Sequence, residues 1–358
     1  MRKIMGLTLT LLLSVVLVLS GCGTKKVDPK EALQGAASNA LKMDSYVVKN
    51  EIKIKDLSVK LAQNNEQVGS VVNMLKDAEI NISQIYQKDP MQTEATLEVK
   101  LKGDVATTIT IPFVVTKEKM YVKIPKVPFF PIPDSVVGKF LVLDYKELAA
   151  QSGGEADLSK VDIAKTQKFA SEVANAIFAE YDSAKYFKDV DAKDAALPDG
   201  FSAKQVVQFN VTNDNVKDAV TIFVNKALPK VLDIMSKDDY RDMFQGLTKE
   251  DIDKAKKEIQ SGSQAELSKG IDEMKNHLKI NQFTVNTAID KNDFPAYQNL
   301  NANLEINDPD TQNNVKIAIE SKSTFSKINE KQKFEIGIPT DTITIQQLQQ
   351  EFGGAGLQ

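Results

Sequence analysis

Cys22 and His277 are the first candidates for reactive chemistry, because the chain of 358 residues contains one cysteine and one histidine. A lone thiol could act as a nucleophile, as half of a disulfide or as a metal ligand. A lone imidazole could act as a general base. A metal site with two or more histidine ligands is excluded, and a Ser-His-Asp triad could use only His277. The surroundings of these two residues decide which chemistry remains.

Cys22 follows a segment that is typical of a secretion signal. Arg2 and Lys3 precede about 15 apolar and small residues from Ile4 to Val18, and the sequence LSGC follows at residues 19–22. An apolar stretch of about 15 residues falls short of the roughly 20 that cross a membrane as a helix, which argues against an uncleaved anchor. We therefore expect residues 1–21 to be a signal peptide and residues 22–28 to be the modified cysteine and a polar tether.

The LSGC block resembles the lipobox of bacterial lipoproteins. The resemblance implies a diacylglycerol thioether on Cys22, cleavage before this residue, and acylation, such as with palmitate, of the new amino terminus. It places the protein on the extracytoplasmic face of a cell membrane, held by its lipid anchor. Gly23 instead of Asp at the next position would not retain a lipoprotein at the inner membrane of a diderm. The lysine-rich composition without tryptophan indicates a Gram-positive host.

Lipidation of Cys22 would leave the rest of the chain without a thiol, and hence without a disulfide, a thiolate nucleophile or a cysteine metal site. Removing residues 1–21 takes away two basic residues and no acid, so the formal net charge moves from −4 to −6. Lysines and acids are interspersed along the chain without a basic face or tail. We expect no nucleic-acid partner.

The remaining candidates for chemistry favour structural interpretations. His277 lies in the charged segment EMKNHLK, where a solvated or capping histidine is expected. The segment DVDAKD at 189–194 begins like a calcium loop, but Lys193 takes a ligand position and the glycine is missing, which favours an acidic turn. The segment NDPDTQNN at 307–314 is expected to form a turn, and the less favoured interpretation is a weak cation site.

Two carboxylate pairs and the known enzyme motifs complete the search for catalytic residues. Asp238 with Asp239, and Glu250 with Asp251, could do acid and base work, but helix ends are the expected role. A nucleophile elbow, a phosphate-binding loop and a dinucleotide fingerprint are absent from the sequence. We expect no enzymatic activity, no metal and no cofactor.

The order of elements along the chain predicts the fold class. Asp28 and Pro29 begin a helix that runs to about residue 41, and alternating strands fill the chain from about 45 to 145. Helices are expected at about 158–186 and 213–279 with the strand KQVVQFNVT between them, and strands return from Gln282, the last of them KFEIGIP. A final helical turn and a frayed tail at 351–358 follow. We expect one α+β domain over residues 29–350, in which a curved antiparallel sheet, an incomplete barrel, wraps around or packs against helices.

This arrangement is similar to the LolA/LppX-type lipoproteins of bacterial envelopes. The resemblance lies in the acylated cysteine, the helix leading into DSYVVKNEIKI, the strands ending in KMYVKIP, the segment GKFLVLDYKEL and the closing SKINEKQKFEIGIP. It implies an incomplete barrel around helices, with an apolar cavity that holds acyl chains. About 100 residues beyond the smaller relatives correspond to the helices at 158–186 and 213–279. The family supplies no catalytic residues.

The segment KIPKVPFFPIPDSVVGKF carries four prolines that keep it out of a central strand. Its apolar residues Phe129, Phe130 and Ile132 could form a lid over a cavity. An alternative is a loop packed on the edge of the barrel, which would protect that edge from association. The two interpretations stay open at this point.

We expect a membrane-anchored envelope lipoprotein that binds a hydrophobic ligand, lipid acyl chains above all, between sheet and helices. The alternating strands supply the expected lining. These residues are Leu97, Val99, Leu101, Met120, Val122, Ile124, Phe129, Phe130 and Ile132. The alternative is a scaffold lipoprotein with a filled core that docks on another envelope protein.

Overall fold

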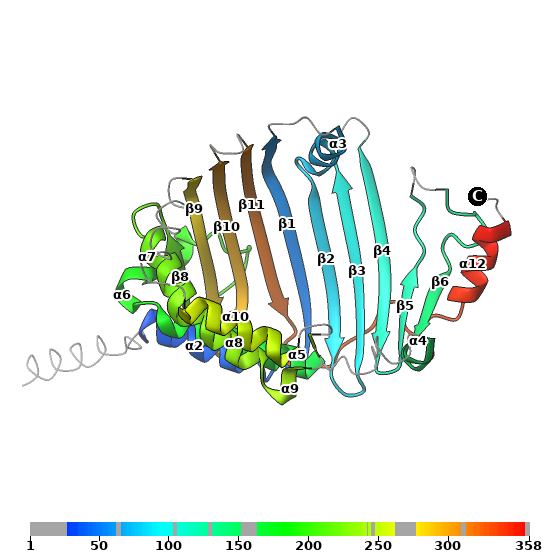
Figure 1. Cartoon of the computed structure of the whole chain (residues 1–358). Helices are drawn as coiled ribbons and strands as arrows, with labels where there is room; N and C mark the ends of the chain where they lie inside the picture. Colours follow the sequence, from blue (N-terminus) through cyan, green and yellow to red (C-terminus); the bar gives the residue numbers. More distant parts are fainter. Residues whose placement is uncertain are drawn as a thin grey trace, which may run out of the picture.

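The computed structural model describes residues 27–61, 66–102, 106–127, 131–151, 163–241, 243–244, 248–261, 277–308 and 313–354. Cys22, Phe129 and Phe130 lie outside these ranges. Described helices and strands together form an α+β fold, as the sequence predicts (Figure 1).

A single open sheet of twelve strands dominates the described part of the chain. In spatial order from one edge to the other, the strands are β12 (Thr342–Thr344), β6 (Phe140–Asp144), β5 (Lys119–Lys123), β4 (Thr107–Thr116), β3 (Gln92–Leu101), β2 (Glu79–Gln87), β1 (Ser45–Lys60), β11 (Asn313–Ser326), β10 (Pro295–Asp308), β9 (Leu278–Ile289), β8 (Gln205–Val211) and β7 (Phe187–Asp189). Neighbouring strands are antiparallel except β12 and β6, which are parallel. The sheet does not close, because β12 and β7 are its two edges.

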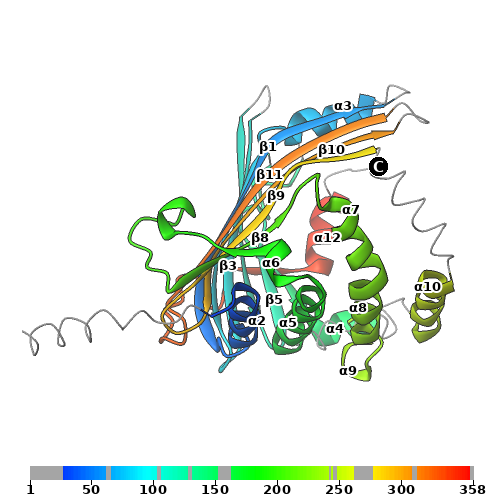
Figure 2. The same cartoon turned by 90° about the vertical axis from the view of Figure 1, so that its left-hand side faces the viewer.

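The central contact of the sheet joins the two ends of the chain. The strand β1 pairs with β2 on one side and with β11 on the other, so that Val48 lies opposite both Gln84 and Phe325. This arrangement turns two meanders that are separated by the helical middle of the chain into one continuous surface. Figure 2 shows this surface bending toward the side on which the helices lie.

The amino-terminal helix α2 (Pro29–Ala40) begins as the sequence predicts. The side chain of Asp28 accepts hydrogen bonds from the backbone N–H groups of Lys30 and Glu31, and Pro29 takes the first helical position. Leu33 and Ala36 are buried, and the helix packs on the β7 to β10 end of the sheet. The short helix α3 (Glu66–Leu75) lies beside β1, at the opposite ends of the strands from α2 (Figure 1).

The helical middle of the chain lies on the same side of the sheet as α2 (Figure 2). Its elements are α5 (Ile163–Glu180), α6 (Ser183–Tyr186), α7 (Val216–Ile222), α8 (Leu228–Met235), α9 (Asp238–Arg241) and α10 (Lys249–Ser261). A π-helical turn over Phe223–Ala227 joins α7 to α8, and Pro229 lies in the first turn of α8. The main core lies between the helices α2, α5, α6 and α7 and the strands β7, β8 and β9, and the rings of Tyr186 and Phe209 stack within it.

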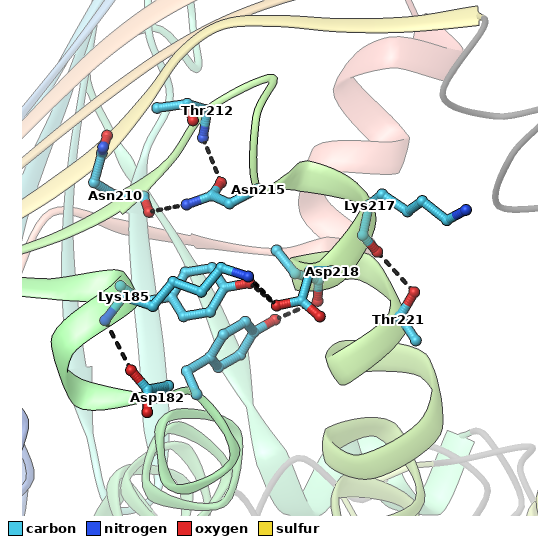
Figure 3. A network of polar contacts seen from close by, with 11 residues as sticks. Asp182, Lys185, Asn210, Thr212, Asn215, Lys217, Asp218 and Thr221 are labelled. Carbon is cyan, nitrogen blue, oxygen red and sulfur yellow. Dashed lines mark hydrogen bonds and ion pairs between the residues drawn. The ribbon is translucent and has the colours of Figure 1, made fainter.

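A polar network joins α7 to the sheet (Figure 3). The hydroxyl of Tyr186 donates to Oδ2 of Asp218 at 2.8 Å, and Nζ of Lys185 lies 2.6 Å from the same oxygen. Asn215 accepts from the backbone N–H of Thr212 at 2.7 Å, at the turn between β8 and α7. Tyr186 is 1% exposed, and burial followed by its bond to Asp218 raises its pKa far above the ordinary value. The tyrosine is therefore a neutral donor that fixes the start of α7.

The carboxyl-terminal segment crosses the outer side of the sheet and returns to the β6 edge. There β12 pairs with β6, and α12 (Ile345–Gly354) packs against both strands. The loop after β5 meets this helix, because Ser135 Oγ donates to Oε2 of Glu351 at 2.7 Å. The short helix α4 (Tyr145–Gln151) follows β6 directly.

Several expectations about elements were wrong. KFEIGIP at 333–339 forms no strand, because its backbone N–H groups bond a carboxylate instead of a neighbouring strand. The strand β9 begins at Leu278, so the helical stretch expected to reach 279 ends earlier. The helix α3 lies in a stretch that was expected to be extended, and the final helix α12 is longer than one turn.

Candidate ligand-binding site

An apolar cavity of about 330 Å³ lies between the helices α2 and α5 and the sheet strands β1, β9, β10 and β11. Its size falls in the range of small-molecule cavities, about 300 to 1,000 Å³. The lining consists mainly of apolar side chains with a few uncharged polar groups. The residues are Leu33, Ala37, Ala40, Leu41, Met43, Tyr46, Gln167, Ala170, Ser171, Ala174, Phe178, Val285, Thr287, Pro295, Gln298 and Phe325.

Small residues on the two helices leave this space open. Ala37 and Ala40 of α2, and Ala170 and Ala174 of α5, face the cavity at helical spacing. Since alanine ends at Cβ, the two helices can pack on one another while a gap remains between them and the sheet. The cavity therefore follows from the residue types on α2 and α5.

Aromatic side chains from β1 and β11 form the side of the cavity that belongs to the sheet. The rings of Tyr46 and Phe325 are 5.4 Å apart in an edge-to-face arrangement, and the ring of Tyr86 lies 5.0 Å from that of Tyr46 with its plane tilted by 39°. Met43, Tyr46, Val48 and Tyr86 form one buried cluster. This cluster gives the cavity a rigid apolar wall.

The polar atoms of the cavity are few and uncharged. Gln167 Nε2 donates to Tyr46 Oη at 3.4 Å, and Ser171 Oγ donates to the carbonyl of Ala37 at 3.1 Å. Burial raises the pKa of Tyr46, so its hydroxyl stays protonated at neutral pH. The cavity therefore presents hydrogen-bonding groups to a ligand without a fixed charge.

The sheet face that bears α2 and α5, here called the inner face, continues beyond the cavity as an apolar surface. Register places Leu97 between Ile82 and Ile111, and Val99 between Ile80 and Ile109, in cross-strand rows. These side chains are half-buried, and Figure 1 shows no described helix across the middle of β2, β3 and β4. With β10 followed only as far as Ile306, the described inner-face ladder positions of β1 to β6 and β8 to β11 hold no charged residue.

Of the residues that the sequence predicts to line the ligand site, five lie on this inner face, outside the cavity. Five of them share the face through the register of β3, β4 and β5: Leu97, Val99, Leu101, Met120 and Val122. Ile124 follows β5, where its backbone bonds Lys139 and Gly138, and Ile132 is half-buried in the loop before β6. The described members of the set do not line the cavity of α2 and α5.

Sequence reasoning missed the residues that line the cavity. The paired alanines of α2 and α5 were a sequence pattern that could have indicated the cavity. The spacing of residues along the chain does not predict, however, that α5 packs on the end of the sheet. The nominated residues came from the strands with the clearest alternation, which form the open part of the inner face.

The other candidates for chemistry have structural partners. His277 lies directly before β9, with Nδ1 2.8 Å from the carbonyl oxygen of Asn307. Asp251 and Thr248 form a reciprocal cap at the start of α10, and these bonds lower the pKa of Asp251. Asp189 accepts a hydrogen bond from Gln205 at 2.8 Å. Within the described ranges, His, Cys, Asp and Glu form no group of three or more that could hold a metal ion.

Comparison of the chain with protein-family models, with curated proteins and with solved structures found no match. Of the helices that the structure describes, none has both the length and the apolar character needed to span a membrane.

Proposed function

We propose that this protein is a non-enzymatic envelope lipoprotein that binds an apolar ligand, in the first place the acyl chains of a lipid, between the inner face and the helices. The observation that carries the proposal is the cavity of about 330 Å³ and its continuation into an uncharged apolar face. A contiguous apolar surface of half-buried side chains still meets water, which is costly unless something covers it. A bound hydrocarbon chain would cover it.

The proposed anchor is the lipid on Cys22, which would hold the protein at the extracytoplasmic face of a cell membrane. Two or three acyl chains give stable anchoring, because each buried methylene contributes about 0.8 kcal/mol. The tether ends at Asp28, where α2 begins, so the cavity lined by α2 would lie near the membrane end of the molecule. A lipid taken from that membrane would have a short path to it.

Apolar burial would supply most of the binding free energy. About eight methylenes withdrawn from water contribute roughly 6 kcal/mol before the costs of association and ordering. The aromatic wall of Tyr46 and Phe325 adds dispersion contacts with any chain in the cavity. We further propose that the sheet and helices wrap around the ligand in the manner of the LolA/LppX-type proteins that the sequence resembles.

The test is to purify the chain without residues 1–22 and to identify any copurifying apolar molecule by mass spectrometry of an organic extract. Binding of a fluorescent diacylglycerol analogue, an uncharged apolar probe, is then measured on the delipidated protein. Ala174→Phe fills the cavity and is expected to weaken probe binding at least tenfold. The matched control is Ala179→Phe on the exposed side of the same helix, which is expected to bind like the wild type.

Two outcomes would count against the proposal. The first is a purified protein that carries no extractable lipid and binds no apolar probe. The second is equal probe binding by the wild type and Ala174→Phe. Cross-linking in intact cells to a single protein partner, combined with either result, would support the scaffold alternative.

A further inference from the structure

A row of uncharged polar side chains crosses the mostly apolar inner face. Thr287 of β9, Gln298 of β10, Ser323 of β11 and Asn50 of β1 are successive partners in the ladder. The same row continues into apolar residues at both ends, with Val207 on β8 and Ile82 on β2. We call these four residues the polar row.

A hydrogen bond within the polar row orders Ser323 and Asn50. The polar groups of Thr287 and Gln298 face the cavity, where a ligand could bond them. Ser323 Oγ donates to Oδ1 of Asn50 at 2.7 Å, which turns the amide nitrogen of Asn50 toward other acceptors. Gln298 is exposed and lines the cavity together with Thr287. Gln84 on β2 adds a further amide diagonal to Asn50.

The polar row separates two apolar zones of the inner face. On one side lies the cavity, whose wall includes Tyr46 and Phe325. On the other side the next row contains Leu300, Ile52 and Ile80, with Ser321 between the first two. Rows farther along β10 and β11 pair Ala302 with Ile319 and Leu304 with Ile317. A ligand that spans both zones must cross the polar row.

We propose that the polar row binds the uncharged junction of a two-chain lipid, with one chain in the cavity and the other along the open apolar zone. This inference rests on the function proposed above. The amide nitrogens of Gln298 and Asn50 would donate to ester or amide carbonyls of the junction, which have no charge to neutralise. The ligand class is therefore a neutral lipid with carbonyl-linked chains, of which a diacylglycerol is the simplest example.

The same surface disfavours a free fatty acid in its ionised form. A carboxylate brought onto the inner face would lose hydration, and the ladder positions of that face described here offer no cation to compensate for it. A plain hydrocarbon would fill the apolar zones but leave the amides of the polar row without partners where it excludes water. The polar row would thus favour a neutral lipid over a more polar, charged ligand and over a ligand without polar groups.

The experiment compares three probes on the delipidated chain at pH 8: dioleoylglycerol, oleate and squalene, each by displacement of a fluorescent lipid analogue. The wild type is expected to bind dioleoylglycerol at least tenfold more tightly than oleate. Gln298→Leu with Asn50→Leu is expected to weaken dioleoylglycerol at least tenfold and to leave squalene within twofold of wild type. The matched control is Asn303→Leu on the opposite face of β10, which is expected to change none of the three.

A second variant protects the test against misfolding and reports a gain instead of a loss. Gln298→Lys keeps a polar group at an exposed position and adds the missing cation, so oleate affinity is expected to rise at least fivefold relative to dioleoylglycerol. The inference is overturned if the variants change the affinities for dioleoylglycerol and oleate by equal factors. It is also overturned if the affinity for squalene falls as much as that for dioleoylglycerol. Failure of the wild type to bind any of the three probes would instead refute the proposed function.

Discussion

Glu94 Oε1 accepts a hydrogen bond from the backbone N–H of Gly337 at 2.6 Å, across 243 positions of sequence. Its other oxygen accepts from the N–H groups of Glu335 and Ile336 at 2.6 and 2.8 Å. Three consecutive N–H groups that converge on one carboxylate form an anion-binding nest. Glu94 is 3% exposed, so this contact is a buried charge that fixes the carboxyl-terminal segment to the outer face of β3.

Loss of the Glu94 charge is expected to destabilise the protein. Glu94→Gln replaces charge-assisted hydrogen bonds by weaker ones and turns an amide N–H toward a backbone donor, which is expected to lower the free energy of unfolding by about 2 kcal/mol. Urea unfolding followed by circular dichroism measures this change. Glu98→Gln, on the same strand but partly exposed, is the control and is expected to change the free energy of unfolding much less than Glu94→Gln. Equal stability of the two variants would show that the nest contributes little.

Acid is expected to weaken the outer face through Glu320. Hydrogen bonds and ion pairs with Lys322 and then Lys55 lower the pKa of Glu320 from 4.5 to about 2. Since the folded pKa lies below the unfolded value, this contribution is fully present above pH 5 and is lost as pH falls toward 2. Allowing for the exposed lysines, we expect about 1 kcal/mol to be lost.

Glu320→Gln tests this relationship, because the variant should be less stable than the wild type at pH 7 and nearly equal to it at pH 2.5. The measurement is the urea midpoint over that range. Glu118→Gln, in the exposed turn between β4 and β5, serves as the control. A wild-type-like midpoint of Glu320→Gln at pH 7 would contradict the prediction.

The sequence predicted the inner face better than it predicted the cavity. Alternation placed Leu97 with Val99 and Met120 with Val122 on common faces, and the register joins both pairs on one face. Local alternation contains no information on the pairing of Val48 with Phe325, which depends on chain closure over more than 270 residues. The position of the cavity depends on this closure and on the docking of α5.

Two errors in element type have identifiable causes. In KFEIGIP, Phe334, Ile336 and Ile338 alternate as a strand would, but the intervening N–H groups bond Glu94, a long-range partner that the local pattern does not show. The helix α3 contains Val68, Val71 and Val72, whose β-branched side chains favour strands on propensity alone. In KFEIGIP a contact outside the local segment therefore decides the conformation, and α3 contacts the neighbouring strand β1.

Removal of the proposed anchor is expected to release the protein from the membrane. Cys22→Ala leaves no thiol for acylation, so the protein should no longer incorporate labelled palmitate. It should then either move from the membrane fraction to the soluble fraction or stay at the membrane through an uncleaved signal peptide. Fractionation after carbonate washing separates these fates, since an uncleaved form migrates more slowly on a gel. Continued labelling of the variant would refute lipidation at this residue.

Enlarging the cavity is expected to link stability to ligand binding. Leu33 is 6% exposed and lines the cavity, so Leu33→Ala is expected to lower the free energy of unfolding by about 3 kcal/mol. A ligand that fills the vacated space should recover part of this loss, because binding to the folded state alone raises its stability. The rise in Tm on adding the lipid identified in the extract is therefore expected to be larger for Leu33→Ala than for the wild type.

Leu41→Ala, at a cavity residue that is 39% exposed, is the matched control and should lower the free energy of unfolding by less than about 1 kcal/mol. A destabilised Leu33→Ala variant whose Tm does not respond to ligand would place the binding site elsewhere on the inner face.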